Sequence, residues 1–175
     1  MRIIRIVLGY VLSATLFALV IPAAVIEFGR GVDGALNLPR WYSGPVNPAV
    51  ASLLGAWGIA WMGWSWWYLL TRGRGHPAEG FGVEVSPVTQ ELVTTGPYAY
   101  ARNPMVFGYF CVMLAIAALH GSAGMLTVVV ILAVIGWVNI AFFEEPRLER
   151  RFADAYREYK SRVPRFLPLR RTKRV

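Results

Sequence analysis

The sequence predicts an all-α fold: a polytopic integral membrane helical bundle of about four transmembrane helices plus a C-terminal amphipathic helix. Composition is the first reason, because 56% of the residues are hydrophobic and only 16% are charged, whereas about 25% are charged in a typical soluble domain. The mean hydropathy of +0.46 agrees. The second reason is the presence of four long apolar stretches that lack the alternation of barrel strands. Since the 175 residues include one cysteine, we expect neither a disulfide framework nor a cysteine zinc cluster.

The four apolar stretches organise the chain. They extend over about 3–26, 46–70, 104–119 and 125–143. A helix needs roughly 20 apolar residues to cross the hydrocarbon core, so the third stretch is short, and the turn at 120–124 predicts that it forms a hairpin with the fourth. We expect a single membrane domain over residues 1–175. Its segments would be two N-terminal spans (1–70), a cytoplasmic loop (71–103), a helical hairpin (104–143) and a cytoplasmic amphipathic tail (144–175).

A signal peptide is the alternative for the first stretch, since a basic start and an apolar run precede Pro22-Ala23-Ala24. The apolar run exceeds the roughly 7–15 residues of a signal-peptide core, which favours a retained span. The segment from about 27 to 45, rich in Gly, Pro and Asn, is then predicted to be a loop on the outer side.

Charge placement predicts the orientation. All Lys and Arg residues except Arg30 and Arg40 lie near the N-terminus, in the 71–103 loop or after Phe143. The positive-inside rule therefore predicts a multi-pass protein with both termini in the cytoplasm. The net charge of +8 is then membrane-surface charge facing anionic lipid. Nucleic-acid binding is not expected, because no DNA- or RNA-binding motif accompanies the charge.

Polar residues that suit a ligand gather on the predicted cytoplasmic side. Asn103-Pro104 is typical of an N-cap followed by proline at the first helical position, so the third span should begin there. The free N–H groups of such an end attract anions, and Arg102 adds a charge suited to a carboxylate or phosphate. An equally compatible interpretation is a well-capped helix with Arg102 against lipid phosphate.

Glu144 and Glu145 lie at the other end of the same hairpin. Carboxylates at a helix C-terminus oppose the dipole by up to about 1 kcal/mol, so the pair favours a nearby cation. Pro146 suggests a helix break, which would instead place Glu145 at the start of a new helix, where acidic residues are common. The functional alternative is that one glutamate binds the ammonium or ribose hydroxyls of a ligand whose anionic end lies near Asn103.

The tail repeats apolar side chains at helical spacing: Leu148, Phe152, Tyr156 and Tyr159. This pattern predicts an amphipathic helix that ends at Arg162-Val163-Pro164 and serves as an interfacial anchor or as a lid. No metal site is expected, because His76 and His120 fall on opposite sides of the predicted membrane.

Two motifs together resemble a known enzyme family. Gln90-Glu91-Leu92-Val93-Thr94-Thr95-Gly96-Pro97-Tyr98 and then Arg102-Asn103-Pro104-Met105 resemble the methyl-donor-binding segment of isoprenylcysteine carboxyl methyltransferases and the related membrane phospholipid methyltransferases. Glu144-Glu145, the aromatic tail helix and Arg162-Val163-Pro164 follow in the same order. The resemblance covers about 88–168 and implies S-adenosyl-L-methionine as cofactor and S-adenosyl-L-homocysteine as product. The residues that it implies for cofactor binding are Gln90, Glu91, Leu92, Val93, Tyr98, Asn103, Pro104, Met105, Val106 and Glu144.

The resemblance leaves the catalytic residues unassigned and gives Arg102, Asn103, Glu145 and Arg162 as positioning candidates. Two positions depart from the family pattern. Many members have histidine where Asn103 stands, and Asn cannot titrate. The prenylcysteine enzymes carry a substrate-contacting arginine where this chain has Ile140.

The resemblance therefore implies an integral membrane methyltransferase that moves a methyl group to a lipophilic or small acceptor, a carboxylate, amine or thiol, at the cytoplasmic face. Its partners would be membrane lipid and that acceptor. The alternative is a non-catalytic membrane assembly or scaffold protein with the same fold. A small transporter is a third interpretation, which the absence of charged residues within spans two to four disfavours.

Overall fold

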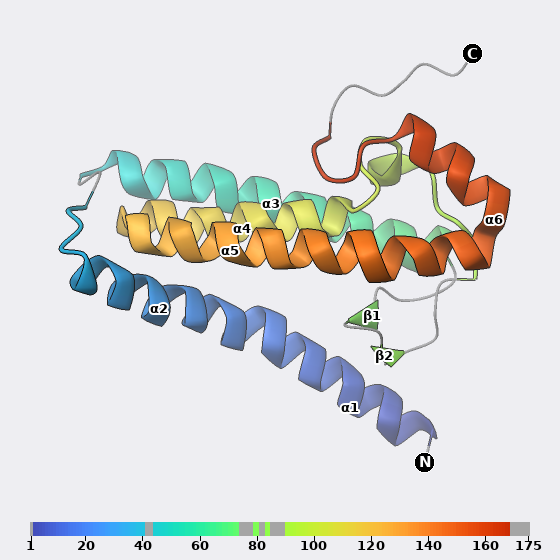
Figure 1. Cartoon of the computed structure of the whole chain (residues 1–175), viewed down its shortest axis with the longest axis horizontal. Helices are drawn as coiled ribbons and strands as arrows, with labels where there is room; N and C mark the ends of the chain where they lie inside the picture. The colour runs from blue at the N-terminus through green and yellow to red at the C-terminus, as the bar shows by residue number, and fades with distance from the viewer. Residues whose placement is uncertain (1, 41–43, 74–78, 81–82, 85–89, 169–175) are drawn as a thin grey trace.

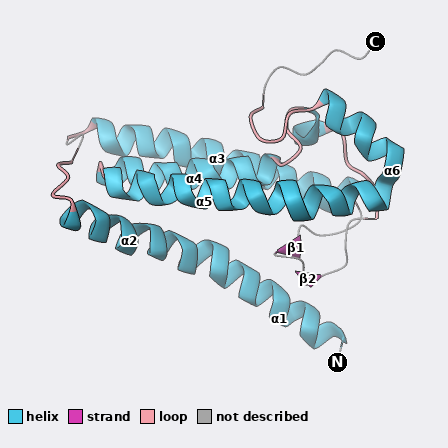
Figure 2. Ribbon diagram, in the orientation of Figure 1, coloured by secondary structure: helices cyan, strands magenta, loops and turns pink. Residues whose placement is uncertain are grey.

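The computed structural model describes residues 2–40, 44–73, 79–80, 83–84 and 90–168. Long helical rods run back and forth, and a bent helix covers one end (Figures 1 and 2). The elements are α1 (Arg2–Thr15), a π-helical turn η1 (Leu16–Val20), α2 (Ile21–Ala35), α3 (Val46–Arg72), a 3-10 turn η2 (Gly96–Ala99), α4 (Pro104–His120), α5 (Ala123–Asn139), a second π-helical turn η3 (Ile140–Glu144) and α6 (Glu145–Arg162).

The predicted all-α class is confirmed for the described residues, with one small exception. Strands β1 (Glu79–Gly80) and β2 (Val83–Glu84) pair antiparallel beside the bundle. In Figure 1, α2 lies along α5, whereas α1 diverges from the other helices toward the N-terminus. The start of α1 and all of α6 lie at the same end of the molecule.

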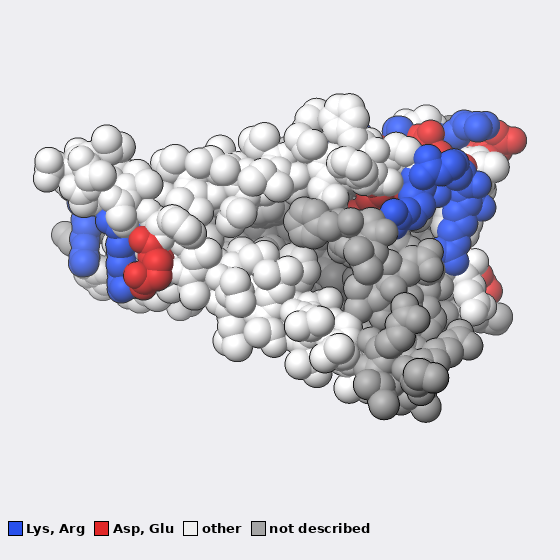
Figure 3. All heavy atoms as spheres, turned by 60° about the horizontal axis from the view of Figure 1, so that its bottom comes forward, with Lys and Arg blue, Asp and Glu red and all other residues white. Residues whose placement is uncertain are grey.

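Among the described residues, two helices are long and apolar enough to cross a membrane, Val7–Ala35 and Ala123–Arg162, with mean hydropathies of 2.2 and 2.5 in their most apolar windows. Helix α4 is apolar but has only 17 residues. Helix α3 has 27 residues but many tryptophans and glycines, which lower its hydropathy. Charged side chains gather at the two ends of the molecule and leave an uncharged surface between them in Figure 3. The predicted membrane character thus has direct support from two of the four predicted spans.

The first rod extends farther than predicted. A loop was expected from about residue 27, but α2 continues to Ala35. The cause is close packing against α5: a Cβ on Gly29 would lie 2.4 Å from the Met125 side chain, and one on Gly124 would lie 2.2 Å from the Gly29 carbonyl oxygen. Glycines that would weaken an isolated helix therefore allow two membrane-type helices to approach at backbone distance.

Helices α3 and α4 meet through a second pair of glycines. A Cβ on Gly58 would lie 2.4 Å from the Gly108 carbonyl oxygen, and one on Gly108 would lie 2.6 Å from that of Gly58. The predicted hairpin of α4 and α5 is confirmed, with Gly121 in the left-handed conformation at φ 59° and Ser122 capping α5. The core at this end of the bundle is built by buried Val25, Met113, Ala117, Met125 and Val129.

Pro146 does not break the helix that it was expected to end. The chain is helical from Ala123 to Arg162, and the π-helical turn η3 immediately precedes the Glu145-Pro146 pair. Proline lacks an N–H and clashes with the carbonyl four residues earlier, and an inserted residue in a π turn relieves that clash. The same arrangement occurs at η1, which immediately precedes Ile21-Pro22. The sharp change in direction comes later, at Ala153, whose φ and ψ are 46° and −123°.

Candidate functional site

The segment from Gln90 to Asn103 is fixed against the end of α3. The backbone N–H groups of Gln90 and Glu91 donate to the Gly73 carbonyl oxygen, at 2.9 and 3.4 Å. Further along, Gly96 takes a φ of +61°, and a Cβ there would lie 2.3 Å from the ring of Tyr68. Only glycine satisfies both demands, so the Gly96-Pro97 turn delivers Tyr98 to a defined place beneath α6.

Tyr98 belongs to an apolar cluster that we call the tyrosine cluster, formed by Val93, Tyr98, Tyr156 and Tyr159. All four are buried. The Tyr159 hydroxyl donates to the Tyr98 carbonyl oxygen at 2.7 Å. Leu148 and Phe152 pack against the cluster, so the predicted apolar face of the tail helix is confirmed, and it covers the 90–103 segment.

The hydroxyls of the tyrosine cluster are held in their neutral form. Burial raises the pKa of Tyr98, and the negative charge of Glu144 raises it further. Burial also raises the pKa of Tyr156 and of Tyr159. The electrostatic effect on Tyr98 means that Glu144, which is half-buried at the end of η3, lies close to a residue 46 positions earlier in the chain. Two of the residues implied for cofactor binding therefore lie within electrostatic range of each other.

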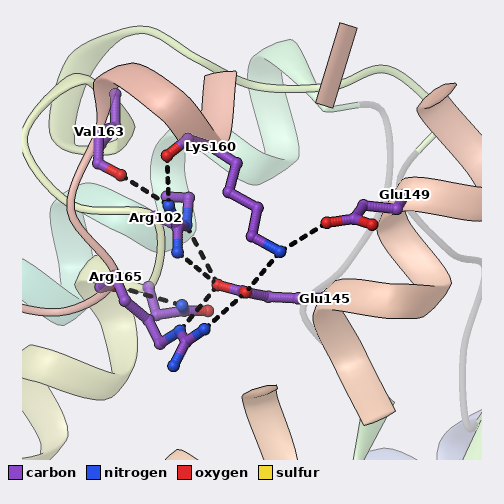
Figure 4. Close-up of polar contacts among 7 residues, drawn as sticks. Arg102, Glu145, Glu149, Lys160, Val163 and Arg165 are labelled. Carbon is purple, nitrogen blue, oxygen red and sulfur yellow. Dashed lines mark hydrogen bonds and ion pairs between the residues drawn. The ribbon is translucent and has the colours of Figure 1, made fainter. Parts of the chain in front are cut away.

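Glu145 is the centre of a buried ion cluster, shown in Figure 4, that we call the Glu145 clasp: Glu145, Arg102, Lys160 and Arg165. Its side chain is 1% exposed. Arg102 contacts Oε1 at 2.7 Å through Nη2 and at 3.1 Å through Nε. Arg165 contacts both carboxylate oxygens at 2.9 Å. Lys160 lies 3.5 Å from Oε2.

The cations determine the protonation state of this carboxyl group. Burial acts to raise the pKa of Glu145, but the hydrogen bonds from Arg165 and Arg102 outweigh it and hold the pKa below its ordinary value. Glu145 is therefore ionised at neutral pH. Removing one partner of a buried ion pair leaves an uncompensated buried charge, which lowers stability by on the order of 3–5 kcal/mol.

Arg102 is committed to this cluster, whereas the sequence suggested that its charge faced a ligand or lipid. Besides Glu145, it donates from Nη1 to the carbonyl oxygens of Lys160 at 2.7 Å and Val163 at 2.8 Å. With a side chain only 8% exposed, it joins the start of α4 to the end of α6. The structure thus assigns Arg102 a positioning contact.

Asn103 begins α4 as predicted, but its side chain does not cap the helix. Its backbone N–H and its Nδ2 both donate to the carbonyl oxygen of Arg165, at 3.0 and 3.2 Å. Pro104 has no N–H to offer. The N–H groups of Met105 and Val106, the next in the first turn, therefore donate no hydrogen bond to the Asn103 side chain, and they lie at the positive end of the helix dipole.

The other predicted residues differ in their burial. Gln90 and Glu91 are exposed, Leu92 is half-buried and packs on the tyrosine cluster, and Met105 and Val106 are half-buried on α4. Arg162 lies exposed at the end of α6, where it pairs with Glu158 at 2.5 Å. The sequence reasoning gave no role to Lys160 or Arg165. Lys160 reaches Glu145 because α6 bends at Ala153, and Arg165 reaches it because the chain reverses after α6. No local spacing in the sequence signals either contact.

The comparison with known families falls on this part of the molecule. Residues 79–155 match the family model of the phospholipid methyltransferases. We call these residues the phospholipid methyltransferase segment. The resemblance carried by the two sequence motifs is therefore confirmed. No curated protein and no solved structure matches the chain.

The phospholipid methyltransferase segment includes Tyr98, Asn103, Glu144 and Glu145 and covers a little under half of the chain. The family is one of membrane methyltransferases that act on lipids and generally use S-adenosylmethionine. Lys160 and Arg165 lie beyond the matched segment, so the clasp joins family residues to a tail outside the match.

Proposed function

We propose that this protein is an S-adenosylmethionine-dependent methyltransferase that crosses the membrane four times and methylates a lipophilic or small acceptor at the cytoplasmic face. The observation that carries the proposal is the match of residues 79–155 to the phospholipid methyltransferase family, a segment in which the charge of Glu144 also acts on Tyr98. The crossings would be the α1–α2 rod, α3, α4, and α5 as far as Phe143. In support, α3 has no charged residue before Arg72 and α4 has none.

The charges around the site fit a zwitterionic donor. The first-turn amides of α4 suit the methionyl carboxylate, because a helix N-terminus binds anions. The Glu144 carboxylate suits the ammonium or the ribose hydroxyls, and Leu92, Val93 and Tyr98 suit an adenine ring. S-adenosylmethionine would supply an electrophilic methyl group at this place.

The protein's task in such a transfer is alignment and exclusion of water. Well-oriented reaction partners gain on the order of 7–11 kcal/mol over free ones. In this chain the aligning elements are the Gly96-Pro97 turn, the start of α4 and the α5–α6 junction, which the Glu145 clasp joins. The neutral hydroxyl of Tyr98 is a donor here, since burial holds its pKa above the ordinary value. We propose that the acceptor enters sideways from the bilayer.

Binding of the donor tests the proposal directly. We expect the purified full chain in detergent to bind S-adenosylmethionine in a calorimetric titration. Glu144→Gln should weaken that binding by about tenfold or more, since a charge-assisted hydrogen bond is worth about 1.5–3 kcal/mol. Glu158→Gln is the matched control, because Glu158 is a glutamate of α6 that is 61% exposed. No binding by the wild-type chain, or equal binding by Glu144→Gln, would overturn the proposal.

Activity and acceptor class are tested with a radiolabelled methyl donor. We expect labelled product when the chain is incubated with membrane extract, and fractionation of that product to identify an amine, carboxylate or thiol acceptor. An amine must lose a proton before transfer, so its rate should rise with pH, whereas a carboxylate acceptor needs no base near neutral pH. A scaffold protein would give no label above the Glu144→Gln background.

A further inference from the structure

Arg165 lies ten residues beyond the phospholipid methyltransferase segment that ends at 155, yet it contacts both sides of the proposed donor site. Its guanidinium holds Glu145 with two parallel bonds of 2.9 Å, Nε to Oε1 and Nη2 to Oε2. Its carbonyl oxygen accepts both the backbone N–H and the Nδ2 of Asn103. One residue of the tail thus fixes the α5–α6 junction and the start of α4.

These two contacts determine the placement of the groups proposed to bind the donor. Glu145 immediately follows Glu144, so fixing the Glu145 carboxylate also fixes the direction in which η3 presents Glu144. Asn103 immediately precedes α4, and its side chain is held by the Arg165 carbonyl, away from the first-turn amides. The same residue therefore orients the acidic end of the site and keeps the amide end open.

We propose that Arg165 is a positioning residue for the methyl donor, acting through Glu145 and Asn103. This inference rests on the proposed function. Arg165 is 23% exposed, and its Cζ lies 5.4 Å from the ring of Trp137 on α5, which fixes the plane of the guanidinium. A planar fork can make two parallel bonds and stack on a ring, whereas the ammonium of lysine is a point charge. The geometry therefore demands arginine rather than any cation.

Arg165→Lys tests the inference without burying an unpaired carboxylate. We expect the variant to remain folded. Its dissociation constant and KM for S-adenosylmethionine should rise about tenfold, equivalent to about 1.4 kcal/mol. Its KM for the acceptor should be unchanged. Arg157→Ala is the control, because Arg157 is an arginine of α6 that is 65% exposed and pairs with the exposed Asp154. It should bind the donor as the wild type does. A merely structural role would change both KM values together.

A double-mutant cycle tests whether Arg165 acts through Glu145. If it does, Arg165→Lys should weaken donor binding in the wild-type background and add little in the Glu145→Gln background, since residues in one network are not additive. Equal donor affinity of Arg165→Lys and wild type, or multiplying effects of the two substitutions, would overturn the inference while the proposed function stands. Failure of the wild-type chain to bind donor would overturn both.

Discussion

The two ends of the bundle each use a carboxylate to join helices, with different partners. At one end Asp33 of α2 accepts hydrogen bonds from the Ser122 hydroxyl and, at 2.7 Å, from the Gly124 N–H. It thereby ties α2 to the start of α5. At the other end Glu145 is paired with cations from three segments of the chain. The first carboxylate is satisfied by neutral donors and the second by charges.

The difference separates a structural end from a candidate site. Neutral donors at Asp33 complete a helix N-terminus and leave it occupied. At the clasp, Arg102, Lys160 and Arg165 pair with Glu145, and Lys160 also pairs with Glu149. The adjacent start of α4 has no side-chain cap from Asn103. A helix N-terminus without that cap, beside the family-matched segment, favours an anionic ligand group at that end.

Removing Glu145 should have the largest effect on stability. Glu145→Ala leaves the buried Arg102 guanidinium without its counter-ion, so we expect the free energy of unfolding to fall by about 3–5 kcal/mol. Thermal unfolding of the full chain in detergent measures the effect. Glu158→Ala, on the exposed face of α6, should change the stability little. A loss no larger than in that control would mean that the clasp does not hold the two segments together.

Acid should weaken the same end. The pKa of Glu145 is lower in the folded chain than in the unfolded one, so its contribution to stability is complete above the unfolded carboxyl pKa of about 4.3 and is lost as the pH falls through the lowered folded value. Melting temperatures measured from pH 7 downward should decline more steeply for the wild type than for Glu145→Gln. Parallel curves would show that other carboxyl groups account for the decline.

A substitution at the end where Asp33 accepts from neutral donors should lower stability less than one at Glu145. Asp33→Ala removes the cap that α5 receives from α2, and cap residues contribute about 0.5–2 kcal/mol. We expect a melting-temperature loss smaller than that of Glu145→Ala, with S-adenosylmethionine affinity unchanged. Glu27→Ala is the control on the same helix, because that carboxylate is 73% exposed and pairs with Arg30. A loss of donor affinity in Asp33→Ala would contradict the division between the two ends.

Much of the fold was readable from local sequence, because apolar run lengths and Gly or Pro signals are local. The spans at 46–70 and 104–119 correspond closely to α3 and α4. The helix through Gly29 was missed, because the contact that favours it is with Met125, far along the chain. Pro146 was misread because a π turn accommodates the ring. The orientation in the membrane and the division into one four-part domain stay predictions.

The site could be predicted only in part, because sequence patterns are local and several of its contacts join distant segments. Motif residues Tyr98 and Glu144 were named together from the family resemblance, and the charge of Glu144 acts on Tyr98 in the structure. The ion pair of Arg102 was missed because its partner, Glu145, is 43 positions away. Arg165 was given no role because only the reversal of the chain after α6 brings it back to Asn103. The spacing of residues along the sequence does not predict ion pairs between distant segments.

The smallest expected effect concerns the bend that brings the tail over the site. Ala153 adopts φ 46° and ψ −123°, a conformation that costs a non-glycine residue on the order of 1–3 kcal/mol. Ala153→Gly should relieve that strain and raise the free energy of unfolding by about 1 kcal/mol. Ala155→Gly, two residues later in regular helix, should lower it by about 0.5–1 kcal/mol. Changes of opposite sign in the free energy of unfolding, at two exposed alanines of one helix, would show that contacts at the site end impose the bend, since nothing in the local sequence favours it. Equal losses in both variants would mean that α6 is straight at Ala153 and that the tail reaches Arg102 by another path.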